Sequence, residues 1–153
     1  MGPGDNPTEN DLQLAYELGT EIAKQNWVLL TGGRNAGVMD AASKGASEHG
    51  GLVVGILPDD NRNRMSHYVD IPIVSGVGSA RNNINVLTSD IVVACGTGAG
   101  TLSEIMLALK AGKRIVLLNQ SKEAIGFLQS LESELLHEAS SVSEAMKEIK
   151  RWL

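Results

Sequence analysis

The sequence predicts an α/β fold: a single Rossmann-like domain in which a doubly wound parallel sheet carries helices on both faces. Three observations predict this fold. Short apolar segments alternate with segments of helical periodicity along the whole chain. Glycine-rich stretches follow three of the apolar segments. The 153 residues contain no linker, repeat or low-complexity segment that would separate a second domain from residues 1–153.

Helices are predicted where apolar residues recur every three or four positions, as Leu14, Leu18 and Ile22 do. This spacing gives helices over residues 9–25, 38–49, 80–88, 101–111, 122–131 and 142–153. Short apolar runs between them predict strands over residues 27–31, 52–57, 71–74, 90–94 and 114–118, with an edge strand near Leu135. Because a helix separates most successive strands, the strands are expected to be parallel.

Composition excludes several functional classes. The formal net charge is −5 and no basic run exists, so a nucleic acid polymer is not an expected partner. The single cysteine, Cys95, cannot form an internal disulfide, and no apolar stretch reaches the ~20 residues of a membrane span. The first residues do not resemble a signal peptide, so a cytoplasmic location and no membrane contact are expected. The three histidines share no metal-ligand spacing, and no metal site is expected.

The three glycine-rich turns, at residues 32–37, 76–79 and 95–100, are the main functional signal. In a parallel sheet all three lie at the carboxyl ends of strands, where ligands of such folds bind. Each turn leads into a helix, whose free N–H groups favour an anion such as phosphate. The alternative is that each turn is only a tight connection. The dinucleotide motif G-x-G-x-x-G and the P-loop are both absent, which disfavours an NAD dehydrogenase or an ATPase.

Arg81 and Glu104 each follow one of these turns. Arg81 falls in the first turn of its helix, where the helix dipole disfavours a cation unless an anion binds beside it. The alternative for Arg81 is a solvated side chain or an ion pair. Residues 101–104 (TLSE) have the spacing of a capping box, so Glu104 is either a helix cap or a carboxylate that contacts the ligand.

The motifs at residues 81–86 (RNNINV), 89–90 (SD) and 98–104 (GAGTLSE) resemble the "lonely guy"-related family, long labelled "possible lysine decarboxylase". Residues 31–40 (TGGRNAGVMD) and 55–58 (GILP) are similar to two further segments of that family. The resemblance extends from about residue 12 to residue 118. No lysine stands in a motif for a pyridoxal phosphate Schiff base, so the decarboxylase label has no support.

The resemblance implies one of two functions. One branch of the family hydrolyses cytokinin nucleoside 5′-monophosphates with an arginine and a glutamate, which fall on Arg81 and Glu104. The other branch resembles the molybdenum cofactor carrier proteins, which bind that cofactor without turning it over. The hydrolase signature P-G-G-x-G-T-x-x-E becomes GTGAGTLSE at residues 96–104, and its lysine after the arginine becomes Asn82. Both departures disfavour hydrolysis and leave an anion cradle intact.

The resulting hypothesis is a cytoplasmic carrier for the molybdenum cofactor (molybdopterin), without catalytic residues. The alternatives are a nucleoside 5′-monophosphate phosphoribohydrolase, in which Arg81 and Glu104 act, and a nucleotide sensor. The expected ligand-binding residues occupy the turns and the helix starts that follow them: Gly32, Gly33, Arg34, Asn35, Gly37, Ser79, Arg81, Asn82, Gly96, Thr97, Gly98, Ala99, Gly100, Thr101 and Glu104.

The resemblance also implies two features of the assembled molecule. Family members form homodimers or homotetramers with helices at the interface, and the same is expected here. The family fold begins with a central strand that this sequence lacks, because residues 1–4 already resemble the turn after it. The position of that strand is therefore expected to be empty or filled by another segment.

Overall fold

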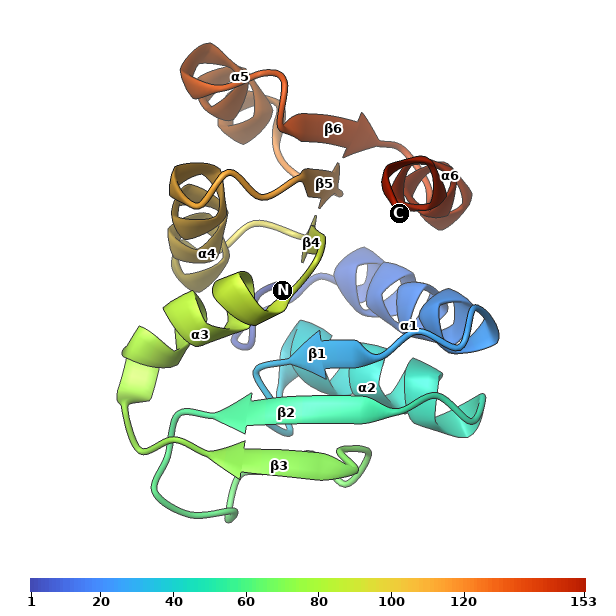
Figure 1. Cartoon of the computed structure of the whole chain (residues 1–153), viewed down its shortest axis with the longest axis vertical. Helices are drawn as coiled ribbons and strands as arrows, with labels where there is room; N and C mark the ends of the chain where they lie inside the picture. The colour runs from blue at the N-terminus through green and yellow to red at the C-terminus, as the bar shows by residue number, and fades with distance from the viewer.

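The computed structural model describes residues 1–153 and has the predicted alternation of helices and strands (Figure 1). The helices are α1 (Glu9–Lys24), α2 (Gly37–Glu48), α3 (Arg81–Thr88), α4 (Ala99–Lys110), α5 (Lys122–Leu131) and α6 (Val142–Trp152), with a 3₁₀ turn, η1 (Gly78–Ala80), before α3. The strands are β1 (Leu29–Thr31), β2 (Val53–Leu57), β3 (Ile71–Val74), β4 (Val92–Cys95), β5 (Ile115–Leu118) and β6 (Leu136–Ala139). The predicted boundaries are therefore confirmed to within a few residues.

The strands pair in two parallel groups, β1-β2-β3 and β4-β5-β6, instead of one uninterrupted sheet. No strand pairing joins β1 to β4. Beside β4, the Met1 amino group donates to the carbonyl of Val93 at 2.7 Å, and the Met1 carbonyl accepts from the N–H of Cys95 at 2.9 Å. These two bonds follow the pattern of a parallel pair, so Met1 occupies a position between the two groups (Figure 1).

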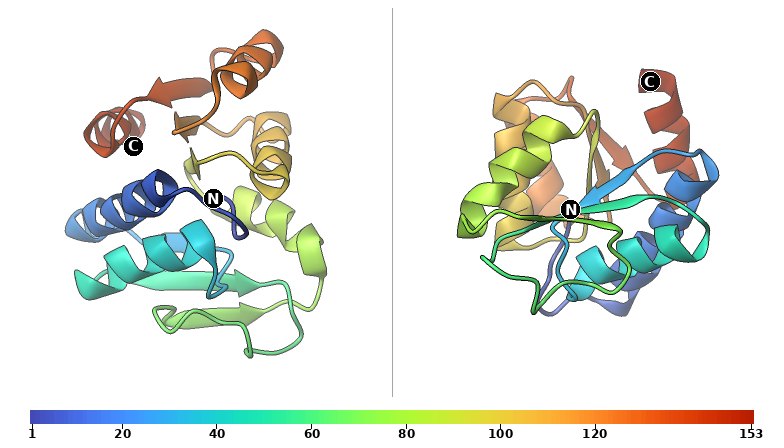
Figure 2. Two further views of the ribbon diagram at one scale, coloured as in Figure 1. Left: turned by 180° about the vertical axis from the view of Figure 1, so that it is seen from behind. Right: turned by 60° about the horizontal axis from the view of Figure 1, so that its bottom comes forward.

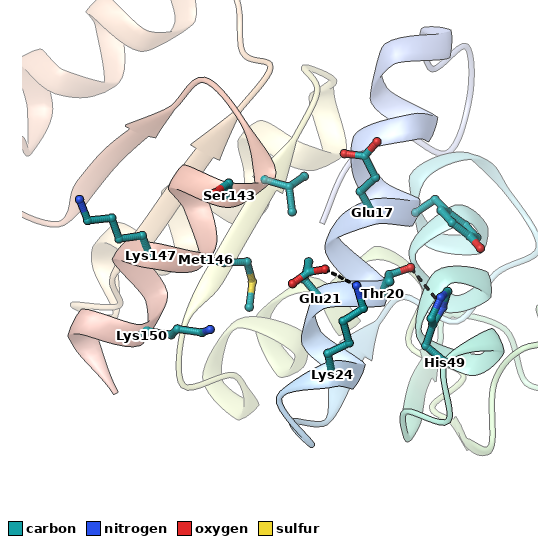
Figure 3. A pocket seen from close by; sticks show the side chains of 11 residues that line it. Glu17, Thr20, Glu21, Lys24, His49, Ser143, Met146, Lys147 and Lys150 are labelled. Atoms are coloured by element: carbon teal, nitrogen blue, oxygen red, sulfur yellow. Dashed lines mark hydrogen bonds and ion pairs between the residues drawn. The ribbon is translucent and has the colours of Figure 1, made fainter.

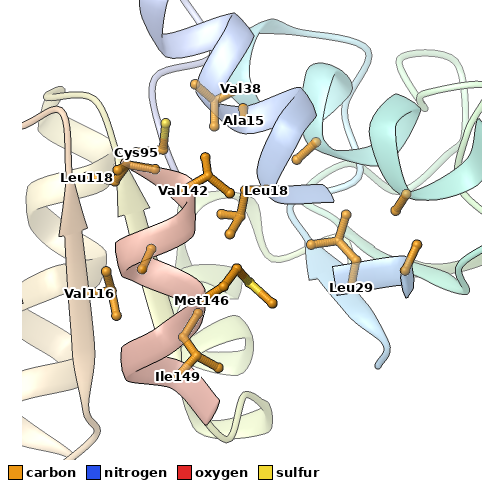
Figure 4. Packing of buried hydrophobic residues seen from close by; sticks show 14 of the residues in the cluster. Ala15, Leu18, Leu29, Val38, Cys95, Val116, Leu118, Val142, Met146 and Ile149 are labelled. Atoms are coloured by element: carbon orange, nitrogen blue, oxygen red, sulfur yellow. The ribbon is translucent and has the colours of Figure 1, made fainter. Parts of the chain in front are cut away.

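Helices cover both faces of the strands, as a doubly wound fold requires (Figure 2). On one face, α1, α2 and α6 enclose the larger apolar core, which includes Leu18, Met146 and Ile149 (Figure 4). On the other face, α3, α4 and α5 enclose a second core. Alternate residues of β5 divide between the two cores, Val116 facing the first and Leu117 the second. This alternation confirms the predicted Rossmann-like architecture.

Two serine or threonine caps fix the ends of helices that flank the site. The Thr8 hydroxyl accepts from the N–H of Asp11 at 3.1 Å, while the Asp11 carboxylate accepts from the N–H of Thr8 at 2.9 Å, a complete capping box for α1. The Ser121 hydroxyl caps α5 by accepting from the N–H of Ala124. None of the helices is long and apolar enough to cross a bilayer.

Candidate functional site

The three glycine-rich turns lie at the carboxyl ends of β1, β3 and β4, as predicted, and each leads into a helix start. The first connects β1 to Gly37 of α2, the second connects β3 through η1 to Arg81 of α3, and the third connects β4 to Ala99 of α4. The turns from the two strand groups are therefore brought to one edge of the molecule. We take this edge, with the first two turns of α3 and α4, as the candidate site.

Gly32, in the first turn, lies against the guanidinium of Arg81, the first residue of the helix that follows the second turn. A Cβ atom on Gly32 would lie 2.0 Å from Arg81 Nη1 and 2.6 Å from Cζ, so only glycine leaves room for the guanidinium. Gly33 has a φ of +70°, and its N–H donates to the Thr31 hydroxyl at 3.0 Å. The first turn is thus shaped to receive the arginine of the second.

Arg81 is buried, with 8% of its surface exposed, and has no carboxylate partner within ion-pair distance. Its Nη1 donates to the carbonyl of Ile56 at 3.0 Å, and Nη2 approaches the sulfur of Met39 at 3.7 Å. Its Nε has no partner in the chain. Burial lowers the pKa of Arg81, and the charge of Glu104 partly opposes that shift. A buried guanidinium with these partners is short of negative charge, which fits an anionic ligand.

Glu104 lies in the second turn of α4 and does not cap the helix. The helix begins two residues before the predicted start, at Ala99, with Gly98 as the capping residue, so the predicted capping box of Thr101 and Glu104 is wrong. The Glu104 Oε1 instead accepts from the Asn85 amide at 3.2 Å. Asn85 Oδ1 and the Thr101 hydroxyl are buried without a partner in the chain. These polar groups form a cluster between α3 and α4.

The remaining predicted residues differ in how their side chains are engaged. Arg34 pairs with Asp59 at 3.4 Å, and Asp59 also pairs with Arg64. Desolvation acts to raise the pKa of Asp59, but the two cations outweigh it and hold that pKa below its usual value. The Thr97 hydroxyl donates to Gln120 Oε1 at 3.0 Å, so it is already engaged. By contrast, no hydrogen bond within the chain engages the side chains of Asn35, Ser79 and Asn82. Gly100 is open, because a Cβ atom there would meet no other atom within 4 Å.

Residues 2–4 are part of the site edge and are not among the predicted ligand contacts. The Pro3 carbonyl accepts from the N–H of Val38 at 3.1 Å, at the start of α2. A Cβ on Gly37 would lie 2.3 Å from that carbonyl, and a Cβ on Gly98 would lie 3.4 Å from the Pro3 ring. The segment thus lies between the first and third turns. The signal that could have identified it is its own sequence, Gly-Pro-Gly, which is typical of a turn at a strand end.

A surface hollow of about 790 Å³ lies elsewhere, between α1 and α6 (Figure 3). Lys24, Lys147 and Lys150 line it, and Glu21 pairs with Lys24 at 2.7 Å. None of the predicted ligand-binding residues lines this hollow. Its three lysines are exposed, whereas Arg81 and Glu104 are buried, so the strand-end edge is the stronger candidate. The structure holds no group of three His, Cys, Asp or Glu side chains placed to bind a metal ion.

Solved structures similar over nearly the whole chain include two cofactor-binding proteins. The molybdenum cofactor binding protein from the phototrophic bacterium Rippkaea orientalis is 52% identical, with a TM-score of 0.97 over 99% of this chain and 93% of that one. The Moco carrier protein from Chlamydomonas reinhardtii is 50% identical, with a TM-score of 0.93 over the same shares. DNA processing protein A from Helicobacter pylori is 22% identical with a TM-score of 0.71, which shows a common fold alone.

Sequence relatives place the chain in a family. An uncharacterized protein from Archaeoglobus fulgidus is 46% identical over 110 residues, 72% of each chain. The cytokinin riboside 5′-monophosphate phosphoribohydrolase of Mycobacterium tuberculosis is 34% identical over 109 residues, which are 69% of this chain and 58% of that protein. The sequence profile of the SLOG cluster4 family matches residues 1–146. On this match, which extends over nearly the whole sequence, the chain belongs to the SLOG cluster4 family.

Proposed function

We propose that this protein binds the molybdenum cofactor at the edge where the three glycine-rich turns meet and carries it without chemical turnover. The observation that carries the proposal is the buried Arg81 guanidinium, which lies against Gly32 and has no carboxylate partner. Similarity to two cofactor-binding proteins, at 50% and 52% identity, supports the identity of the ligand.

The terminal phosphate of the cofactor is the group that the turns suit. The first N–H groups of α4 supply donors, as do those of α2 other than the N–H of Val38, which donates to Pro3. Gly100 lets a ligand approach the backbone closely. Arg81 supplies the buried positive charge, and Ser79 and Asn82 have unengaged polar side chains at the start of α3. Glu104, held by Asn85, and the unpartnered hydroxyl of Thr101 provide polar contacts for the rest of the ligand. Arg34 is a further cation at the same edge.

The rival function is hydrolysis of a nucleoside 5′-monophosphate, which the mycobacterial relatives support. In that reaction Glu104 would stabilise positive charge that develops on the ribose, and Arg81 would hold the phosphate. The third turn disfavours it. Gly96 stands where the hydrolase signature has proline, but its φ is +74° and its N–H donates to the Leu118 carbonyl at 2.9 Å. Proline can satisfy neither condition, so this turn follows a path that the hydrolase signature cannot.

We further infer a homodimer or homotetramer located in the cytoplasm. The outer surfaces of α3 and α4 expose Ile84, Leu87 and Met106, at 41%, 55% and 43% of their surface, which supports helix packing between copies. Sedimentation velocity would measure the assembly, and a monomer at all concentrations would contradict it.

The function is tested by measuring binding and turnover on the same preparations. The wild-type protein is expected to bind molybdenum cofactor released from a molybdoenzyme saturably and to release no adenine from AMP. Arg81→Ala should weaken cofactor binding by about tenfold or more, since it removes a charge-assisted contact to phosphate. Lys147→Ala, at the hollow between α1 and α6, is the matched control and should leave binding unchanged. Adenine release that Glu104→Ala abolishes would establish the hydrolase instead.

A further inference from the structure

The turn between β4 and α4 is held in place by side chains from the segment that follows β5, and Gln120 makes most of these contacts. Gln120 Nε2 donates to the carbonyls of Gly96 and Ala94, at 2.5 Å and 3.3 Å. Gln120 Oε1 accepts from the Thr97 hydroxyl at 3.0 Å. One amide therefore binds three residues at the end of β4 and the beginning of the turn. We propose that Gln120 is a positioning residue that fixes this turn for ligand binding, an inference that rests on the proposed function.

Two further hydrogen bonds complete the attachment of the turn. The N–H of Gly96 donates to the Leu118 carbonyl at 2.9 Å, and the N–H of Ser121 donates to the Thr97 hydroxyl at 3.3 Å. Thr97 thus uses its hydroxyl both as a donor to Gln120 and as an acceptor from Ser121. The hydroxyl's single donor is thereby used within the chain, so it has none to offer an anionic ligand. Through its hydroxyl, Thr97 therefore acts with Gln120 in positioning the turn.

A buried carboxylate lies under the same turn. Asp11, 4% exposed, accepts from the Asn119 amide at 2.6 Å. A Cβ on Gly96 would lie 2.4 Å from Asp11 Oδ1, so the turn passes directly over this carboxylate. The pair of Asp11 and Asn119 limits movement of Gly96 toward the core, and Gln120 limits movement away from it.

The turn needs such restraint because its own sequence does not supply it. Glycines at positions 96, 98 and 100 leave the backbone many accessible conformations. Proline, which would restrict the turn, is incompatible with the φ of +74° at Gly96. The orientation of the turn sets where the free N–H groups of Ala99 and Gly100 point, and it sets the start of the helix that carries Thr101 and Glu104. The Gln120 amide therefore substitutes for backbone rigidity in this turn.

Three variants test this role. Gln120→Ala removes all three contacts of the amide, and it should weaken binding of the molybdenum cofactor by about tenfold while the melting temperature changes by only a few degrees. Gln120→Glu keeps the acceptor for Thr97 but cannot donate to Gly96 when ionised. Gln129→Ala, an exposed glutamine on α5, is the matched control and should behave as wild type.

The amide resonances of Gly96, Gly98 and Gly100 in the ligand-free protein give a readout that does not depend on any ligand. They should shift and exchange faster in Gln120→Ala. In Gln120→Glu they should return toward wild-type values as the pH is lowered through the pKa of the new carboxyl group, because the protonated acid regains a donor. The wild-type protein is measured over the same pH range as the control.

The outcomes separate this inference from the proposed function. If Gln120→Ala leaves the three glycine resonances and the affinity unchanged, Gln120 does not position the turn. Two results together would also overturn it. In Gln120→Ala, cofactor binding would fall only as part of a general loss of thermal stability, and in Gln120→Glu the glycine resonances would not return toward wild-type values at low pH. If the wild-type protein fails to bind the cofactor, the proposed function fails, and the glycine resonances alone then decide whether Gln120 fixes the turn.

Discussion

At the scale of single residues, the contact between Gly32 and Arg81 gives the most direct test of the proposed anion site. We expect Gly32→Ala to displace the guanidinium, because its Cβ would lie 2.0 Å from Nη1. Binding of the molybdenum cofactor should then fall by about tenfold or more, as for the loss of a charge-assisted contact. Isothermal titration calorimetry measures the loss. Gly126→Ala is the control, since a Cβ there meets no atom within 4 Å. Equal affinities for Gly32→Ala and wild type would show that Arg81 does not contact the ligand.

Cys95 provides a second prediction at this scale. Burial raises the pKa of the Cys95 thiol from its ordinary value of 9.0 to about 11, with Asp11 adding to the shift and the Met1 amino group opposing it. At any pH below 9, the native protein should contain about a hundredfold less thiolate than a free cysteine, so iodoacetamide should alkylate it slowly. Rapid labelling at pH 8 without unfolding would contradict this.

The same shift has a defined effect on stability. Because the native state holds the thiol proton more tightly than the unfolded chain, its contribution is complete below about pH 9 and declines as the pH rises toward 11. The free energy of unfolding of the wild type should therefore fall more steeply over this range than that of Cys95→Ala. Parallel slopes for the two proteins would mean that the thiol titrates normally.

At the scale of secondary-structure elements, two glycines allow α1 and α2 to pack closely. A Cβ on Gly45 would lie 2.0 Å from the Tyr16 carbonyl, and one on Gly19 would lie 2.1 Å from the Ala42 carbonyl. We expect Gly45→Ala to destabilise the fold by about 1–3 kcal/mol, because overpacking outweighs the gain in helix propensity. Gly126→Ala, in the open, should stabilise α5 by about 0.5–1 kcal/mol. Urea unfolding of both variants measures the difference, and a stabilised Gly45→Ala would contradict the close packing.

Periodicity predicts the elements well but cannot predict how side chains engage at their ends. The helix at residues 122–131 has the predicted boundaries, and the hydroxyl of Ser121 caps its start. The predicted start of α4 is two residues late, since Gly98 caps the helix without a side-chain hydrogen bond and leaves no polar signal. The partner of Glu104, Asn85, lies 19 positions earlier on a different helix. A contact of that kind depends on how α3 packs against α4, which local sequence does not specify.

At the scale of the whole molecule, the division of the strands into two groups bears on ligand binding. The strands form two groups, and Met1 makes two hydrogen bonds to β4 between them. The candidate site extends across this division, because the first turn follows β1 of one group and the third turn follows β4 of the other. Arg81 lies on α3, in the connection that leads from one group to the other (Figure 2).

A ligand at this edge should therefore stabilise both groups at once. We expect the molybdenum cofactor to slow amide hydrogen exchange at residues 32–39 and at residues 96–102 together, because the proposed binding mode places it against the starts of both α2 and α4. Since only the native state binds, a hundredfold excess over Kd should add about 2.7 kcal/mol to the free energy of unfolding. Exchange in α6 at residues 143–150, which lines the hollow beside α1, is the internal control. Protection confined to α6, or to one of the two strand groups, would place the ligand elsewhere. A phosphate bound both by Arg81 against Gly32 and by the start of α4 would slow exchange in both strand groups.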